Sequence, residues 1–138
     1  MWRILLTALV LAGCVQLPPS PEDLRAKKFE SLPDKSVIYI VRAAMDSYEA
    51  SGLALDDRAQ ITTYGGTNYR WEVAPGTHRI AGIAAANESV TLSTAPGRIY
   101  FLEHTVLGTP RSGPQFTNLR QIGEQEGRTL VVRSQLLL

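Results

Sequence analysis

Two patterns of apolar residues along the chain predict β-strands. Val37–Val41 is an unbroken run of β-branched and aromatic residues ended by Arg42, which predicts a strand covered on both faces and central in a sheet. Tyr69, Trp71 and Val73 alternate with polar residues, which is typical of a strand with one buried face. We therefore expect Tyr69 and Trp71 to point into the core.

Turn signals separate these strands from several others. Ala74-Pro75-Gly76 and Ala95-Pro96-Gly97 each follow an alternating segment and precede another strand, and Gly76 is expected to have a positive φ angle. Such punctuation predicts a mainly β chain folded as an antiparallel β-sandwich of six to seven strands. The further strands are expected within 53–55, 61–64, 78–84, 89–94 and 99–106, and 116–122 is a candidate for an additional, last edge strand.

Two helices are expected beside the strands. Ser20 can cap a helix that has proline at its first position, which predicts about ten helical residues that end before Pro33 and contribute little to the core. Further on, Glu124–Ser134 has apolar residues at helical spacing, although Val131-Val132 favours a strand. A C-terminal helix is the preferred interpretation.

The first fourteen residues have the arrangement of a secretory signal. Arg3 precedes the apolar run Ile4–Leu11, which is far shorter than the ~20 residues of a membrane-spanning helix. Leu11-Ala12-Gly13-Cys14 resembles the lipobox of bacterial lipoproteins. The resemblance implies signal-peptidase recognition through Leu11, Ala12 and Gly13, cleavage before Cys14, and lipidation of Cys14. The alternative is an inert, buried Cys14 behind an uncleaved apolar stretch.

The lipobox divides the sequence into three parts. Residues 1–13 form the expected lipoprotein signal peptide, residues 14–34 hold the lipidated Cys14, a proline-rich tether and the short helix, and residues 35–138 form the β-sandwich domain. Acyl chains on Cys14 make the membrane the first expected partner, because two or three chains hold a protein stably. By resemblance to enteric lipoproteins, Val15 implies an outer-membrane lipoprotein of the cell envelope that faces the periplasm.

Composition removes several functions from consideration. Among 138 residues, 14 Lys and Arg balance 13 Asp and Glu, which gives no electrostatic basis for binding nucleic acid. Two His and one Cys are too few for a disulfide framework or for a zinc site of Cys and His ligands. We expect no metal and no cofactor.

Catalytic groups are equally sparse. His78 and His104 are expected to be structural, because each lies in a predicted strand and no carboxylate is near in sequence except Glu103, on the opposite face from His104. Asp56-Asp57 is interpreted as a turn, although such a pair can bind a cation. The sequence therefore predicts no catalytic residue and no enzyme; an enzyme would need a site that this pattern does not show.

Two tyrosines near turns are candidate surface residues. Tyr48 and Tyr64 lie outside the predicted core, and Gly108–Pro114 is a surface loop rich in glycine and proline. Exposed aromatic side chains of this kind suit peptide or sugar ligands. Tyr48 and Tyr64 are therefore the candidate binding surface.

Several of these segments together resemble a known family. Tyr39-Ile40-Val41-Arg42, Pro75-Gly76-Thr77-His78 and Gly97-Arg98-Ile99-Tyr100 are similar to motifs of a family of small bacterial lipoproteins of uncharacterised function. The resemblance covers about residues 35–133 and implies a prealbumin-like or carboxypeptidase-regulatory-like β-sandwich. It brings no catalytic residues, and the stretch from Ala44 to Gly52 is longer than in the family.

These observations predict a lipid-anchored envelope lipoprotein that acts as a non-catalytic binding or assembly module. Its expected partner, besides the membrane, is an envelope protein. The alternative is a module that binds carbohydrate or peptidoglycan of the cell wall through Tyr48, Tyr64 and the Gly108–Pro114 loop.

Overall fold

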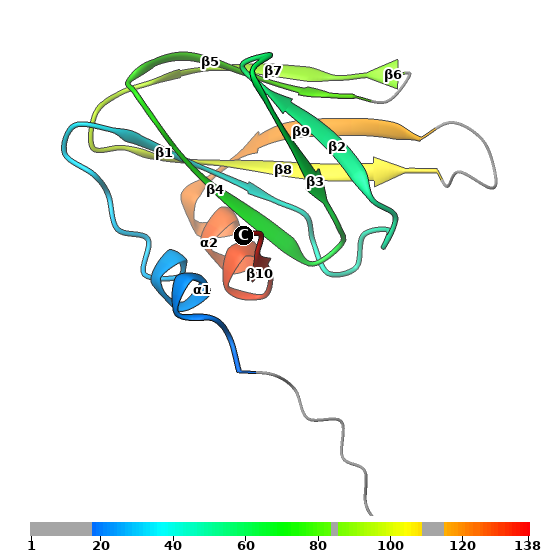
Figure 1. Cartoon of the computed structure of the whole chain (residues 1–138), viewed down its shortest axis with the longest axis horizontal. Helices are drawn as coiled ribbons and strands as arrows, with labels where there is room; N and C mark the ends of the chain where they lie inside the picture. Colours follow the sequence, from blue (N-terminus) through cyan, green and yellow to red (C-terminus); the bar gives the residue numbers. More distant parts are fainter. Residues whose placement is uncertain (1–17, 84–85, 109–114) are drawn as a thin grey trace, which may run out of the picture.

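The computed structural model describes residues 18–83, 86–108 and 115–138. Two β-sheets face each other, and two helices cover the outer face of one of them (Figure 1). The predicted β-sandwich is confirmed, with a helical layer added on one side. The expected signal peptide, with Leu11, Ala12, Gly13 and the lipidation site Cys14, lies outside the described residues.

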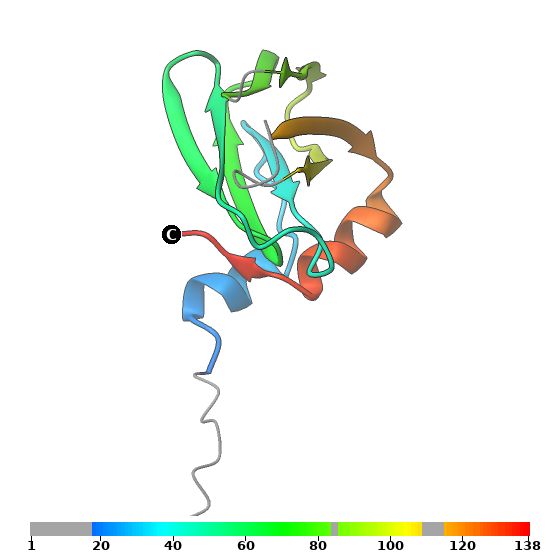
Figure 2. The same cartoon turned by 90° about the vertical axis from the view of Figure 1, so that its right-hand side faces the viewer.

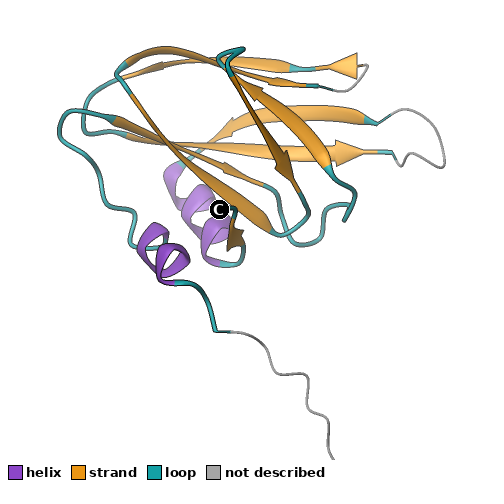
Figure 3. Cartoon of the chain, viewed as in Figure 1, coloured by secondary structure: helices purple, strands orange, loops and turns teal. Residues whose placement is uncertain are grey.

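In the described part of the chain, ten strands and two helices form this arrangement (Figure 3). The strands are Ser36–Val41 (β1), Ser51–Leu55 (β2), Ala59–Thr63 (β3), Thr67–Val73 (β4), Gly76–Gly82 (β5), Ala86–Asn87 (β6), Ser89–Thr94 (β7), Ile99–Leu107 (β8), Phe116–Ile122 (β9) and Gln135–Leu136 (β10). The helices are Pro21–Ala26 (α1) and Glu124–Val132 (α2). The strand number exceeds the six to seven expected, partly because β6 and β10 are too short to leave a pattern in the sequence.

The first sheet is built around β1. It has the order β10-β4-β1-β8-β9-β6, and the second sheet has the order β3-β2-β5-β7. All residues of β1 are buried, as its continuous apolar run predicted. β1 pairs antiparallel with β4 but parallel with β8, so the first sheet is mixed rather than purely antiparallel. The parallel pair arises because the chain visits the second sheet, in β5 and β7, before β8 returns beside β1.

Side chains of β1 alternate between two cores. Ile38 and Ile40 belong to the core between the sheets, against which Tyr69 and Trp71 pack as predicted. The other apolar residues of β1 belong to a second core beneath the helices, which is formed by Ala26, Val37, Tyr39, Val41, Phe101, Ile122 and Val131. Burial on both faces explains why the strand carries no charged side chain.

Turn positions agree with the sequence pattern. Gly76 has a φ angle of 144°, in the region that favours glycine. Asp56 and Asp57, with φ angles of 51° and 54°, form the turn between β2 and β3 together with Arg58. The interpretation of the aspartate pair as a turn is therefore confirmed.

α1 is shorter than predicted but contributes more to the core. The backbone N–H of Asp23 donates to Ser20 Oγ at 3.0 Å, which confirms the predicted cap. The helix ends after Ala26, and Phe29 then adopts a positive φ angle of 53°, which no helix continues through. Ala26 is buried, and Phe29 and Leu32 pack against the second core.

α2 confirms the helical interpretation of the C-terminal segment. It lies against β8, where Gly127 is so close to the ring of Phe101 that an added Cβ would overlap the ring. Phe101 and Val131 are both almost completely buried in this contact. Only a glycine at this position allows the helix backbone to approach the sheet this closely.

A Gly127→Ala substitution is expected to destabilise the protein by about 1–3 kcal/mol, because overpacking outweighs the ~1 kcal/mol gain in helix propensity. Gly123→Ala is the matched control, since nothing lies within 4 Å of a Cβ added at Gly123. Its effect should stay below about 1 kcal/mol. Urea denaturation measures both variants, and a stable Gly127→Ala protein would contradict the close packing of α2 on β8.

Candidate functional site

The strand register gathers several chain connections at one end of the sandwich. Because β1 and β8 are parallel, the segment that follows β1 lies at the same end as the connection from β8 to β9. The turn before β4 is also there, since Asn68 pairs with Val41, and Leu53 pairs with Gly82 so that β5 ends there. We call residues 42–50, 64–66, 82–83, 107–108 and 115–116 the loop end. It lies at the right in Figure 1 and faces the viewer in Figure 2.

Exposed large apolar side chains are concentrated at the loop end. Six of the nine that the described residues expose lie there, namely Met45, Tyr48, Tyr64, Ile83, Leu107 and Phe116. Met45 and Tyr48 are the most exposed of the six, at 97% and 84%. The other three, Leu24, Val132 and Leu138, belong to the helices and to the segment after β10. Apolar groups gathered in this way are typical of binding surfaces.

Both tyrosines that the sequence singled out lie at the loop end. Their segments touch at Gly65, where an added Cβ would lie 2.8 Å from the carbonyl oxygens of Asp46 and Ser47. The predicted Gly108–Pro114 loop joins β8 to β9 at the same end, although residues 109–114 lie outside the described residues. Sequence reasoning missed four apolar neighbours, because single apolar residues beside strands resemble core residues: Met45, Ile83, Leu107 and Phe116.

A buried guanidinium fixes the backbone that carries Tyr48. Arg42 directly follows β1 and is only 1% exposed. Its Nε donates to Asp46 Oδ2 at 2.9 Å, its Nη1 donates to the Glu49 carbonyl at 2.7 Å, and its Nη2 donates to the Ser47 carbonyl. Two of these acceptors flank Tyr48 in the sequence. The tyrosine therefore projects from a segment that is held on both sides.

The same network ties this segment to neighbouring strands. Nη1 of Arg42 also donates to the carbonyl of Thr63, at the end of β3, at 3.0 Å. Asp46 Oδ2 accepts from the backbone N–H of Val106 in β8 at 3.1 Å. The Arg42–Asp46 ion pair thus joins a buried guanidinium to a carboxylate that is 11% exposed, and both groups make further hydrogen bonds, which compensate for the desolvation of the charge. The sequence pattern ends a strand at Arg42 and gives no sign of this burial.

His104 lies beside this network, away from solvent. It is completely buried, its Nδ1 is 3.1 Å from Thr63 Oγ1, and its Nε2 has no hydrogen-bond partner in the described part of the chain. Burial, with the nearby charge of Arg42, lowers the pKa of His104 to about 4. The adjacent Glu103 pairs with Arg120 at 2.6 Å on the other face of the strand, as predicted. His104 is therefore a neutral, internal side chain.

His78, which is distant from carboxylates in the sequence, lies beside one in the fold. Pairing of β2 with β5 brings Asp56 Oδ2 to 2.7 Å from His78 Nδ1, while Nε2 is 2.6 Å from the Ala74 carbonyl. Burial raises the pKa of Asp56, but hydrogen bonds from His78 and from the Arg79 N–H outweigh this effect and lower it. Both ring nitrogens face acceptors, so His78 serves to hold the β2–β3 turn against β5.

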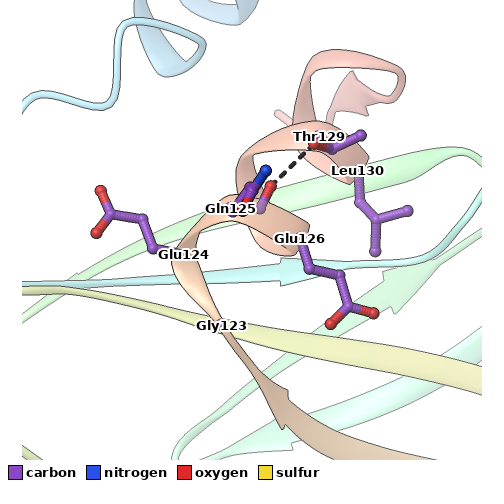
Figure 4. A pocket seen from close by; sticks show the side chains of 6 residues that line it. All are labelled: Gly123, Glu124, Gln125, Glu126, Thr129 and Leu130. Carbon is purple, nitrogen blue, oxygen red and sulfur yellow. Dashed lines mark hydrogen bonds between the residues drawn. The ribbon is translucent and has the colours of Figure 1, made fainter.

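Two further features of the described residues concern metal binding and a hollow beside α2. Within residues 18–83, 86–108 and 115–138, no three His, Cys, Asp or Glu side chains gather to hold a metal. A wide hollow of about 560 Å³ lies over the exposed face of α2 (Figure 4). Glu124 and Glu126 point to opposite sides of it, and Thr129 Oγ1 donates to the Gln125 carbonyl within the helix. No groups converge there on a reacting atom.

No protein-family model matches the chain, and no curated protein is significantly similar. The resemblance to small bacterial lipoproteins stays a prediction. Neither helix in the described residues has the length and apolar character needed to cross a membrane.

Replacing Arg42 is expected to cost far more stability than replacing a surface arginine. In Arg42→Ala, the largely enclosed Asp46 loses its cation and three backbone carbonyls lose their donor, a change that typically costs about 3–5 kcal/mol of unfolding free energy. Arg79→Ala is the matched control, because the Arg79–Asp57 pair is exposed and such pairs contribute about 1 kcal/mol or less. Urea denaturation measures both losses, and equal losses would contradict the role assigned to Arg42.

His104 is expected to make stability fall in mildly acidic solution. Its pKa is about 4 in the folded protein against 6.5 for an exposed histidine, so the stabilisation is complete above pH 6.5 and is lost as the pH falls toward 4. The full loss is on the order of 3 kcal/mol.

A His104→Gln variant lacks this titrating group. Its unfolding free energy should therefore change less between neutral pH and pH ~5 than that of the wild type. Urea denaturation at the two pH values measures the difference. The same pH dependence in both proteins would contradict a buried neutral imidazole at this position.

Proposed function

We propose that this protein is a cell-envelope lipoprotein of bacteria, anchored through Cys14, whose loop end binds another envelope protein without catalysis. The observation that carries the binding role is the concentration of six exposed large apolar side chains at that end. The anchor rests on the lipobox at Leu11, Ala12, Gly13 and Cys14.

The rigidity of the loop end supports a binding role. Arg42 holds the carbonyls on both sides of Tyr48, so the backbone that carries the exposed ring needs little further ordering when a partner binds. A surface ordered beforehand loses less entropy on association. The lipid anchor adds to this effect, because confinement to one membrane raises the effective concentration of partners held there.

The titratable groups near the loop end support a non-catalytic role. Arg42 and Asp46 satisfy each other and the backbone around them, and His104 is neutral and internal. Each of these groups has a structural task in the folded protein. Catalysis by Arg42, Asp46 or His104 would require these contacts to break.

A wall-glycan module is the second candidate. Tyr48 and Tyr64 favour it, since both rings are exposed on segments that touch each other at Gly65. The accompanying aliphatic side chains favour a protein instead, because Met45, Ile83 and Leu107 offer apolar contact but no stacking face for a sugar. We therefore place the protein partner first.

Photo-crosslinking in intact cells tests the proposal. A photoreactive phenylalanine derivative is placed at Tyr48 and, as the matched control, at Gln60, an exposed position in β3. We expect a defined protein adduct from position 48 and none from position 60. Glycan adducts from position 48 would favour the second candidate, and adducts equal at both positions would overturn the assignment of the loop end.

The anchor has its own test in the same cells. Cys14→Ser is expected to abolish lipidation, to leave an uncleaved or soluble precursor, and to remove the adduct formed from position 48. Membrane fractionation and mass spectrometry measure the first two effects. A Cys14→Ser chain that stays in the membrane fraction as the wild type does would refute lipid anchoring at Cys14.

A further inference from the structure

The segment after β10 lies beside the place where the chain leads back to Cys14. Pro18 and Pro19 border a small hollow of about 190 Å³ together with Gln135, Leu136 and Leu138. Leu138 is 90% exposed. Only three residues separate Pro18 from Cys14 in the sequence.

Backbone hydrogen bonds hold this segment in place. β10 pairs with the start of β4, and the N–H of Leu137 donates to the Asn68 carbonyl at 2.7 Å. The N–H of Leu136 donates to Asp23 Oδ1 at 2.8 Å, and Asp23 is itself only 4% exposed in α1. Leu137 is thus fixed relative to the beginning of the domain, and Leu138 follows it directly in the sequence.

Chain length limits how far this part of the domain can stand from a lipid on Cys14. Four peptide steps from Cys14 to Pro18 span at most about 14 Å when fully extended. The headgroup layer of each leaflet is about 5–7 Å thick. A diacylglyceryl group on Cys14 therefore keeps Pro18, and the exposed Leu138 beside it, close to the bilayer surface.

We propose that Leu137 and Leu138 enter the headgroup region of the membrane that holds Cys14 and form a second, non-covalent contact that orients the domain. The proposal rests on the proposed lipidation of Cys14. Since the anchor makes this contact intramolecular, burial of two leucines is enough to populate it.

The contact is apolar rather than electrostatic. The leucines border a hollow of about 330 Å³ whose charged residues have mixed sign, namely Glu22, Arg25, Glu30, Arg70 and Glu72. Such a surface gains little from anionic lipids. Zwitterionic lipid is therefore sufficient, and the contact should resist added salt.

The contact also sets the direction of the loop end. α1 lies below both sheets in Figures 1 and 2, whereas the loop end extends from the right-hand ends of β8 and β9 in Figure 1 down to the level of β10. With the α1 side on the bilayer, the loop end faces along the membrane surface and stays accessible to a partner in the same membrane.

Fluorescence quenching by brominated lipid tests the contact. The chain from Cys14 onward is coupled through its one thiol to a maleimide phospholipid in phosphatidylcholine vesicles brominated near the headgroup. The chain from Cys14 onward contains one tryptophan, Trp71, so a Trp71→Phe substitution removes the tryptophan fluorescence of the protein before a new tryptophan is introduced. Leu138→Trp is compared with the control Gln60→Trp, which is exposed on β3.

We expect the Leu138→Trp variant to lose most of its fluorescence in brominated relative to unbrominated vesicles, and the Gln60→Trp variant to lose little. Equal quenching of the two variants would overturn the proposal. The coupled lipid supplies the anchor independently of acylation in cells. An unacylated Cys14 in cells thus overturns the lipoprotein proposal, whereas an unquenched Leu138→Trp variant overturns the membrane contact alone.

Discussion

The buried guanidinium of Arg42 holds the backbone of residues 42–50 in place, as the hydrogen bonds between paired strands do elsewhere in the fold. This segment contains neither helix nor strand, so its carbonyl groups have no regular partners. Arg42 donates to two of them and to the Thr63 carbonyl, while Asp46 balances its charge. Because desolvating a charge costs several kcal/mol, the guanidinium stays inside only while these acceptors surround it. The charge and the segment therefore hold each other in place.

The parallel pairing of β1 with β8 makes that arrangement possible. It places the end of β8 beside the residue that follows β1, where the N–H of Val106 donates to Asp46. An antiparallel partner would bring a different strand end to this point. The mixed sheet, which departs from the sequence prediction, is thus a condition for the ordered loop end.

The parts of the fold that the sequence predicted are those specified by short-range periodicity. The burial of β1, the inward direction of Tyr69 and Trp71, and the positive φ angle of Gly76 each follow from a few neighbouring residues. The length of α1 does not, because the Phe29 ring packs against Tyr39 and Phe101 and takes its backbone out of the helix. Tertiary packing there outweighs the helical preference of the segment.

The residues of the candidate site also divide into those that a short-range sequence pattern predicts and those that only the folded structure reveals. Tyr48 and Tyr64 could be selected from their positions near turns, because an aromatic residue outside an alternating strand has no core to enter. The burial of Arg42 and the His78–Asp56 contact could not, since each joins residues that only the sheet register brings together. A charged residue at a strand end is normally exposed, and no local pattern distinguishes the exception.

If Cys14 is lipidated as proposed, the short tether from Cys14 to Pro18 couples the direction of the loop end to the contact that Leu137 and Leu138 make with the membrane. With three residues between Cys14 and Pro18, a lipid on Cys14 leaves the domain little freedom to tumble above the bilayer. The hydrogen bond from the N–H of Leu136 to Asp23 fixes β10 to α1, so the segment after β10 and the rest of the domain change orientation together. A long flexible tether would let the loop end sample every direction, at a lower effective concentration for any one partner. Under the proposed anchoring, a short tether would favour partners that lie beside the loop end in the plane of the same membrane.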